Sequence, residues 1–435
     1  MSADPDQTLG QYSLRLIRLW LWFTQSRSAL WMLAALLLLP RAGLLFLDIT
    51  PTSDAGWYFS RAQLLSQGQG YLDVTGLETA FWPPGWPMAM AAIFKVFGVS
   101  LASIGVFNLV CQAVTALLIL RLGPSLFGSA EAGRIGVLLL ALYPNNALYV
   151  PLALTEPFYT ALIFLAAWAL VEDKGLKTKI IAGALWGFAI LVKTQTILLL
   201  AMVLLIGFWR ASPKMPGAYL QGVWRACVVI VIAAAIVLPW SLRNYRVFGQ
   251  WVTVSTNGGY SLLVGNNPKI WAPRPVLEAP INQFNADKRR IGELRYDQQA
   301  RREALDWAKE NPGDFMRLVP VKFLRLWVPD GEAVWAYEMG MRNWAAASPY
   351  FLGLRLLNQA WYFLLLLLAF GAAGSWVQQK RREGQPLMGW WLLPYVLACH
   401  ATITCLIFSG QTRYHYPVMP WLCIAGGWWL AQCIE

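Results

Sequence analysis

Ten apolar segments recur along the chain, separated by shorter polar stretches. A hydrocarbon core of about 30 Å needs roughly 20 apolar residues per helical span, and several segments approach that length. Gly and Pro occur inside them, whereas a membrane β-barrel would show short strands of alternating polarity. The pattern predicts an all-α polytopic membrane bundle with about ten spans, at residues 29–47, 101–121, 134–150, 157–171, 180–192, 196–209, 224–240, 355–376, 389–408 and 417–433.

Two short stretches decide the topology. Pro84–Phe97 reaches only about 21 Å as a helix, so we expect it to lie at the outer interface instead of crossing. One helix over Ile180–Trp209 would bury Lys193 at mid-membrane, which is unfavourable. We therefore expect either two short helices joined by a polar turn at Lys193-Thr194-Gln195 or one broken helix that dips into an outer cavity. Arg41, inside the first span, has no evident partner in the sequence.

Composition supports this interpretation. The chain of 435 residues is 57% hydrophobic and only 13% charged, with a mean hydropathy of +0.46. Its net charge of +12 would suit a nucleic-acid partner, but the basic residues lie in short clusters between apolar segments, as in cytoplasmic loops. The clusters are Arg15, Arg18 and Arg27; Lys174, Lys177 and Lys179; Arg210, Lys214 and Arg225; and Lys380, Arg381 and Arg382.

With these clusters inside, the chain divides into four parts: a cytoplasmic N-terminus (1–28), a transmembrane bundle (29–240) with an outer loop at 48–100, an outer-side segment (241–350) and the last spans (351–435). The outer-side segment should contain two juxtamembrane helices. In the first, Asp287–Lys309, an apolar face would contain Ile291, Leu294, Leu305 and Ala308. In the second, Phe315–Trp327, Lys322 and Arg325 would lie at headgroup level.

Two acids follow apolar segments on the predicted outer side. Asp54 lies soon after the first span, and Glu156 stands in "LTEPF". A plain interpretation is helix capping, with Ser53 or Asp54 capping a helix to about Leu65 and Thr155 capping the next one. Since both carboxylates emerge at one face and depth, they also suit a shared polar site.

Cations accompany these acids. Arg243 and Arg413 flank outer ends of spans, and Lys193 lies at the helix break. Arg binds a phosphate through paired hydrogen bonds and Lys through a point charge, although interfacial Arg is often only an anchor. His400 is expected to make a packing hydrogen bond inside a span. His415, at the outer rim, could contact a metal or phosphate, but one His defines no zinc site.

Several sequence stretches, in their order, resemble a known superfamily. There is no Walker loop, dinucleotide fingerprint or HExxH motif. The stretches "SDAGWYFSRAQLLSQGQGY" (53–71), "WPPGWP" (82–87), "LTEPF" (154–158), "RNYRVFGQWVTVSTNGGYSLLVGNNP" (243–268), "EALDWAKENPGDF" (303–315) and "RYHYPVMP" (413–420) are similar to bacterial GT-C glycosyltransferases. The likeness is to the branch that contains protein O-mannosyltransferases and lipid A aminoarabinose transferases, and it runs through most of the chain.

This resemblance implies a GT-C bundle whose first outer loop carries the catalytic acid and whose sugar donor is a polyprenyl phosphate such as undecaprenyl phosphate. By the likeness, Asp54 deprotonates an acceptor hydroxyl, and Glu156 orients the substrate or a divalent ion. The lipid phosphate would bind Arg243, Lys193 and Arg413. The substrate cavity would be lined by Trp57, Tyr58, Glu78, Trp82, Asn244, Tyr414 and His415.

The chain departs from the superfamily pattern at two places. Many relatives have Asp-Glu where this chain has Asp54-Ala55, and His-Pro-Pro where it has Trp82-Pro83-Pro84. Any metal-binding role of that Glu or His therefore does not carry over. No cofactor is assigned, and a divalent cation remains an option.

The implied function is transfer of a hexosyl or pentosyl group to a hydroxyl of a protein, lipid or glycan acceptor. The reaction would take place at the periplasmic or external face of a bacterial inner membrane. One alternative is a polyprenyl-lipid or sugar transporter, which would show inverted repeats and charges at the membrane midplane. Another is a non-catalytic subunit whose segment 241–350 binds a partner.

Overall fold

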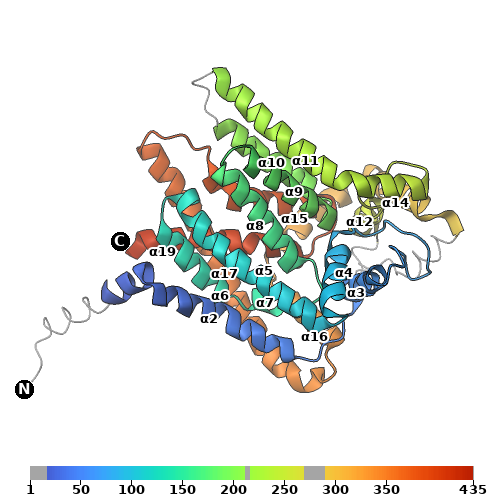
Figure 1. Ribbon diagram of the computed structural model, residues 1–435, viewed down its shortest axis with the longest axis horizontal. Helices are drawn as coiled ribbons and strands as arrows, with labels where there is room; N and C mark the ends of the chain where they lie inside the picture. The colour runs from blue at the N-terminus through green and yellow to red at the C-terminus, as the bar shows by residue number, and fades with distance from the viewer. Residues whose placement is uncertain (1–16, 211–215, 269–289, 435) are drawn as a thin grey trace, which may run out of the picture.

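The computed structural model describes residues 17–210, 216–268 and 290–434, and these residues form a helical bundle. Figure 1 shows its long helices running roughly side by side, with α3, α4, α12 and α14 gathered at one end. The β-pairing among the described residues consists of isolated bridges, Ile49 with Met341 and Leu72 with Glu78. The expected all-α class is confirmed. Arg15, Lys214 and the start of the predicted helix at Asp287 lie outside the described residues.

Five of the described helices are long and apolar enough to cross a membrane. They comprise α2 (Arg27–Gly43) with the 3-10 turn η1 (Leu44–Phe46), α5 (Leu101–Phe127), α11 (Pro216–Phe248), α17 (Trp344–Arg382), and α18 (Leu393–Ile407) with η3 (Trp390–Leu392). The protein is thus a multi-pass membrane protein, while the total of ten crossings stays a prediction.

The shorter bundle helices complete the predicted set. They are α6 (Ala130–Ala141), α7 (Pro144–Leu148), α8 (Glu156–Glu172), α9 (Leu176–Val192), α10 (Thr196–Arg210) and α19 (Met419–Ile434). The predicted span 134–150 is divided between α6 and α7, so the expectation of one continuous helix there is wrong. The break at Lys193 is present, because α9 ends at Val192 and Lys193 has extended backbone angles.

Small residues let α9 and α11 approach closely. A Cβ built on Gly187 would lie 2.7 Å from Cβ of Ile236 and 2.8 Å from the Ala233 carbonyl oxygen, and Gly183 stands equally close to Val229. Such small-xxx-small spacing is a common way of packing helices within membranes. The contact fixes the α9 end that carries Lys193.

Arg41 finds its partners at the end of α6. Its guanidinium is fully buried and donates to the carbonyl oxygens of Leu37, Leu140 and Ala141 and to Asn146 Oδ1. The last carbonyls of a helix have no intrahelical partner and carry partial negative charge, so a buried cation is stabilised there. The charge that the sequence left unplaced therefore joins α2 to α6.

The outer end consists of α3 (Ser53–Ser66), α4 (Gly85–Phe97), α12 (Gly258–Gly265), α14 (Glu293–Glu310), α15 (Pro312–Trp327) and α16 (Ala333–Gly340). The buried stripe of α14 is Glu293, Asp297, Ala300 and Ala304, whereas Leu305 of the predicted apolar face is exposed. The predicted apolar face is wrong because the buried side of α14 contacts polar groups of neighbouring loops instead of apolar side chains. Glu293 accepts hydrogen bonds from Thr79, the Ala80 amide and Thr256, so α14 holds the outer loop 48–100 in place.

Lys322 of α15 is also not where the sequence predicts. Its side chain is 1% exposed instead of lying at headgroup level. The ammonium group donates to Asn266 Oδ1 at 2.8 Å and to the Leu406 carbonyl at 3.0 Å. Burial lowers the pKa of Lys322 to about 8. α15 is thereby joined to α18 through polar contacts in addition to apolar packing.

Candidate functional site

Asp54 forms an ion pair with Arg413. Asp54 lies in the first turn of α3, and its Oδ2 is 2.7 Å from Nη1 of Arg413, with the two side chains 17% and 20% exposed. Arg413 belongs to the 3-10 segment η4 (Thr412–Val418), which precedes α19. The residue before the acid, Ser53, has a φ of +50°, a left-handed conformation that is strained for a residue with a side chain. The backbone is thus strained at the residue directly before Asp54, where it sets the direction of the Asp54 side chain.

Glu156 forms a second pair, with Lys193. Glu156 is the first residue of α8, and its Oε1 is 3.0 Å from the ammonium nitrogen that follows the end of α9. The two side chains are only 2% and 11% exposed, and Thr155 donates to the other carboxylate oxygen at 3.1 Å. The capping interpretation holds in part, because both acids lie in the first turn of their helices and Thr155 is the N-cap residue of α8. Neither α3 nor α8 has a side-chain hydrogen bond at its N-cap.

Tyr414 connects the two pairs. Its ring lies 5.8 Å from the guanidinium carbon of Arg413 and 6.0 Å from the ammonium of Lys193. Burial alone would lower the pKa of Arg413, but Asp54, Tyr414, Glu156 and Glu332 together raise it well above its ordinary value. The structure therefore brings four predicted charges into one site and keeps Arg413 charged.

A cavity of about 30 Å³, roughly the volume of one water molecule, borders Lys193 and Tyr414. His400 lines it as well and makes the packing hydrogen bond expected of it, to the Gln195 carbonyl at 2.9 Å. The α9–α10 break thus faces a small, mostly apolar cavity, and the ion pair with Glu156 stabilises the lysine at this depth.

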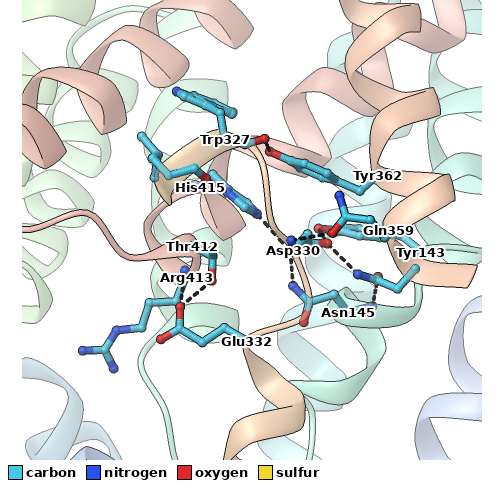
Figure 2. A network of polar contacts seen from close by, with 12 residues as sticks. Tyr143, Asn145, Trp327, Asp330, Glu332, Gln359, Tyr362, Thr412, Arg413 and His415 are labelled. Atoms are coloured by element: carbon cyan, nitrogen blue, oxygen red, sulfur yellow. Dashed lines mark hydrogen bonds and ion pairs between the residues drawn. The ribbon is translucent and has the colours of Figure 1, made fainter. Parts of the chain in front are cut away.

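Figure 2 shows a polar network directly behind Arg413. His415 is fully buried there instead of lying at the rim, so its predicted contact with a metal or phosphate is wrong. Its Nδ1 is 2.7 Å from the Leu326 carbonyl and its Nε2 is 3.0 Å from Asp330 Oδ1. Both ring nitrogens thus face oxygen atoms, and Nε2 pairs the ring with the Asp330 carboxylate.

The Asp330 carboxylate is the partner of the buried His415 ring. It also accepts hydrogen bonds from Tyr143, Asn145 and Asn358 at 2.6 to 2.9 Å. Burial alone would raise the pKa of Asp330, but the hydrogen bond and charge of His415, with the further donors, hold it below its ordinary value. The Asp330–His415 ion pair is therefore a fixed support beneath η4.

Glu332 holds the same segment from the other side. It accepts hydrogen bonds from the hydroxyl of Thr412 and from the backbone amide of Arg413 (Figure 2). Neither Asp330 nor Glu332 was predicted from the sequence. The available signal was "PDGE" (329–332), two acids around a glycine directly after the α15 region. Apart from Asn358, the side-chain partners of these carboxylates lie 80 or more positions away, so that signal gave no hint of what they bind.

Arg243 is placed apart from the two pairs. It donates to the carbonyl oxygens of Thr79 and Tyr71, and it forms an ion pair with the exposed Glu78 at 3.3 Å. No contact among the described residues joins Arg243 to either acid pair. Asn244 is fully buried and donates to the carbonyls of Val252 and Val254. Arg243 and Glu78 thus hold the outer loop to α11, while Asn244 holds the segment that follows α11.

Aromatic rings form the wall beside Asp54. Trp57, Tyr58 and Trp82 meet edge to face, with ring centroids 5.8 to 6.3 Å apart. Burial, and next the charge of Asp54, raise the pKa of Tyr58, so that its phenol stays protonated. Such rings offer apolar faces and a hydroxyl donor, a combination suited to stacking on a sugar.

A divalent cation does not fit the residues that are gathered here. Among the described residues, no three His, Cys, Asp or Glu side chains lie together as metal ligands would. The two carboxylates of the site are each paired with a cation, which leaves a weak donor set for a metal. We derive no step through a metal.

Comparison with solved structures shows the fold. An oligosaccharyltransferase from Archaeoglobus fulgidus, tethered to an acceptor peptide with an NVT sequon, is similar with a TM-score of 0.55 and 11% identity. The alignment covers 94% of this chain but only half of that protein. ArnT from Cupriavidus metallidurans bound to undecaprenyl phosphate aligns over 92% of this chain and 78% of its own, with a TM-score of 0.45 and 13% identity. The chain therefore shares the helical fold of the aligned part of the oligosaccharyltransferase.

Comparison with family models gives a more specific match. Residues 82–242 match the model described as dolichyl-phosphate-mannose-protein mannosyltransferase. The matched region begins at Trp82 and includes Glu156 and Lys193, while Asp54 and Arg413 lie outside it. No curated protein matches the sequence. The resemblance to GT-C enzymes of the O-mannosyltransferase type is confirmed by the family model and the fold.

Proposed function

We propose that this protein is a membrane glycosyltransferase that moves one sugar from a polyprenyl-phosphate donor to an acceptor hydroxyl at the outer face of the membrane. The observation that carries the proposal is the joining of two carboxylate–cation pairs, Asp54–Arg413 and Glu156–Lys193, through Tyr414. The matched family model, named for transfer of mannose from a dolichyl phosphate to protein, supports a lipid-linked donor.

The two cations suit the leaving group. When the sugar departs, the phosphate gains negative charge, and fixed cations in a poorly hydrated site stabilise that charge strongly. Among the described contacts, Arg413 uses Nη1 for Asp54 and Nε for Gln411, which leaves Nη2 to donate to a phosphate oxygen. Lys193 adds a point charge beside it. Arg243, which holds the outer loop, is the weakest of the three predicted phosphate ligands.

The chemistry then needs a base at the acceptor. The acceptor oxygen forms a bond to the anomeric carbon, the carbon–oxygen bond to phosphate breaks, and its electron pair leaves on the phosphate. The hydroxyl proton passes to Asp54. Among the described contacts only Oδ2 of Asp54 is engaged, so Oδ1 remains for that proton. Glu156 orients Lys193 and, through it, the leaving phosphate.

The charge distribution supports an outer location in a bacterial inner membrane. The site lies at the ends of α8 and α9 opposite to the basic cluster Lys174–Lys179, which the positive-inside rule assigns to the cytoplasm. The sugar, hexosyl or pentosyl, and the acceptor, whether protein, lipid or glycan, would be bound by the outer-side segment.

A two-part experiment tests the proposal. Mass spectrometry of lipids from a deletion strain should reveal the accumulated polyprenyl-linked sugar, and the purified full-length protein should transfer that sugar. Asp54→Asn should reduce transfer by at least 100-fold, the usual range for loss of a general base, yet still bind undecaprenyl phosphate. Glu338→Gln, which changes an exposed acid that belongs to neither pair, is the matched control and should transfer normally. Normal turnover by Asp54→Asn would refute the assignment.

The transporter alternative predicts a different result. Proteoliposomes containing the protein would then exchange labelled lipid-linked sugar across the bilayer without forming a new glycosidic bond. Asp54→Asn and the Glu338→Gln control would exchange at equal rates, because neither the proton nor the anomeric carbon takes part.

A further inference from the structure

A second pocket lies at the other end of α8 and α9. Its volume is about 330 Å³, and it is formed where α8, α9, α10, α11 and η3 come together. α8 has 17 residues, so roughly 25 Å of helix separates this pocket from Glu156. Pockets of about 300 Å³ and above are large enough to bind small ligands. Nothing in the proposed transferase reaction uses this one.

Three charged groups form one rim of the pocket. Asp173, directly after α8, accepts a hydrogen bond from Lys179 and forms an ion pair with Nη1 of Arg225 at 2.9 Å. Lys179 also donates to the Gly175 carbonyl at 3.1 Å, which leaves one of its three N–H groups. Among the described contacts Arg225 engages only through Nη1, and its side chain is 47% exposed. Asp173 thus orients Lys179 and Arg225, and each of these side chains keeps N–H groups that can donate to a bound ligand.

The rim has a surplus of positive charge. Lys174 and Lys177 belong to the same turn and are exposed, while the carboxylates nearby are Glu172 and Asp173. Four cations against two carboxylates favour an anionic ligand. Basic pockets between helices on the cytoplasmic side of a membrane are typical places for anionic lipid headgroups.

The remaining walls are apolar. Leu170, Leu204, Phe208 and Trp390 line the pocket, and Gly207 lets the Trp390 ring lie against α10, since a Cβ there would be 3.2 Å from the ring. On the outward faces of α10 and α11 next to the pocket, large apolar side chains are exposed, including Leu205, Trp209 and Trp224. Exposed Trp and Leu at a helix end are expected to face the bilayer interface. The pocket therefore joins a cationic rim to a lipid-facing surface.

We propose that this pocket binds an anionic phospholipid. The lipid phosphate would accept hydrogen bonds from Arg225 and Lys179, and the first part of an acyl chain would lie along Phe208 and Trp390. A free phosphate would use the rim but not the apolar walls, and a zwitterionic lipid would use the walls but gain less from the net charge. The proposal is independent of the transferase reaction.

The test is native mass spectrometry of the full-length, detergent-solubilised protein titrated with phosphatidylglycerol. Arg225→Gln should weaken binding about tenfold, since a charge-assisted hydrogen bond is lost, and Arg225→Lys should restore part of it. Lys177→Gln, which removes an equal charge near the rim but from a residue that does not line the pocket, is the matched control and should change binding less than twofold. Equal effects of Arg225→Gln and Lys177→Gln would overturn the site, because they would indicate general attraction to a basic surface.

Two further arms separate the lipid from other sources. Leu204→Trp fills the apolar end without changing any charge and should also weaken phosphatidylglycerol binding, which keeps the test decisive should Arg225→Gln fail to fold. Glycerol 3-phosphate should bind at least tenfold more weakly than phosphatidylglycerol. Phosphatidylethanolamine should also bind at least tenfold more weakly than phosphatidylglycerol. Equal binding of glycerol 3-phosphate would make this a phosphate site without a lipid, and equal binding of phosphatidylethanolamine would make the charged rim irrelevant. Either result would overturn the proposal.

Discussion

Replacing Asp330 by asparagine should destabilise the protein strongly, although the two side chains have nearly the same shape. Four donors surround the carboxylate: His415 Nε2, the Tyr143 hydroxyl, and the side-chain amides of Asn145 and Asn358. An asparagine offers one acceptor oxygen in place of two, and its own amide would point at donors. It would also remove the carboxylate charge that pairs with the buried His415 ring.

The magnitude follows from that lost charge. Removing one partner of a buried ion pair typically costs about 3–5 kcal/mol, because the remaining charge stays desolvated. Losing neutral hydrogen bonds alone costs about 1–2 kcal/mol. In a His415→Gln background no charge is left unpaired, so the same Asp330→Asn change should cost only the smaller amount. The difference predicts a coupling energy of about 1–4 kcal/mol between the two residues.

The assay is a double-mutant cycle of unfolding free energies in mixed detergent micelles, followed by circular dichroism. Wild type, Asp330→Asn, His415→Gln and the double variant are compared at neutral pH. Additive costs, with a coupling below about 0.5 kcal/mol, would refute the buried ion pair. Because this pair supports η4, Asp330→Asn should also weaken binding of undecaprenyl phosphate if the proposed function holds. The unfolding cycle stands without that condition.

Further predictions concern other parts of the fold. The pKa of Lys322 is about 8 in the folded protein and ordinarily 10.5, so between these pH values the unfolded chain binds one more proton than the folded chain. The free energy of unfolding should therefore rise by about 3 kcal/mol from pH 8 to pH 10.5 in wild type but not in Lys322→Met. Parallel pH curves for the two proteins would contradict this. Gly187→Leu should separate α9 from α11 and lower the melting temperature, whereas Gly353→Leu, with nothing within 4 Å of its Cβ, should leave it unchanged. Ser53→Gly should raise unfolding free energy by about 1 kcal/mol by relieving its positive φ, and an unchanged value would show that no strain is stored there.

The helices could be predicted because the bilayer imposes their lengths and apolar character. The break at Lys193 followed from the same reasoning, since a lysine inside one continuous span would have been too costly. Topology predicted that Asp54, Glu156, Lys193 and Arg413 would all lie on the outer side. It did not predict that Asp54 pairs with Arg413 and Glu156 with Lys193, because that pairing depends on contacts across the bundle. Arg243, equally basic and on the same side, instead binds the carbonyls of the outer loop.

The errors share a physical cause. The interpretations of α14, Lys322 and His415 all assumed that buried positions are apolar and that charged ones face water or headgroups. In this protein large apolar side chains such as Leu367, Phe370 and Val231 are exposed on the long helices, where a bilayer would cover them. The interior of the outer end must satisfy the backbone of loops that have no regular hydrogen bonding of their own, so buried acids and amides take that role. A sequence of membrane spans therefore reveals its lipid-facing surface readily. The polar core that positions Arg413 depends on partners far apart in the sequence, such as Gln112 and Tyr416, which are 304 positions apart, and it becomes visible only in the fold.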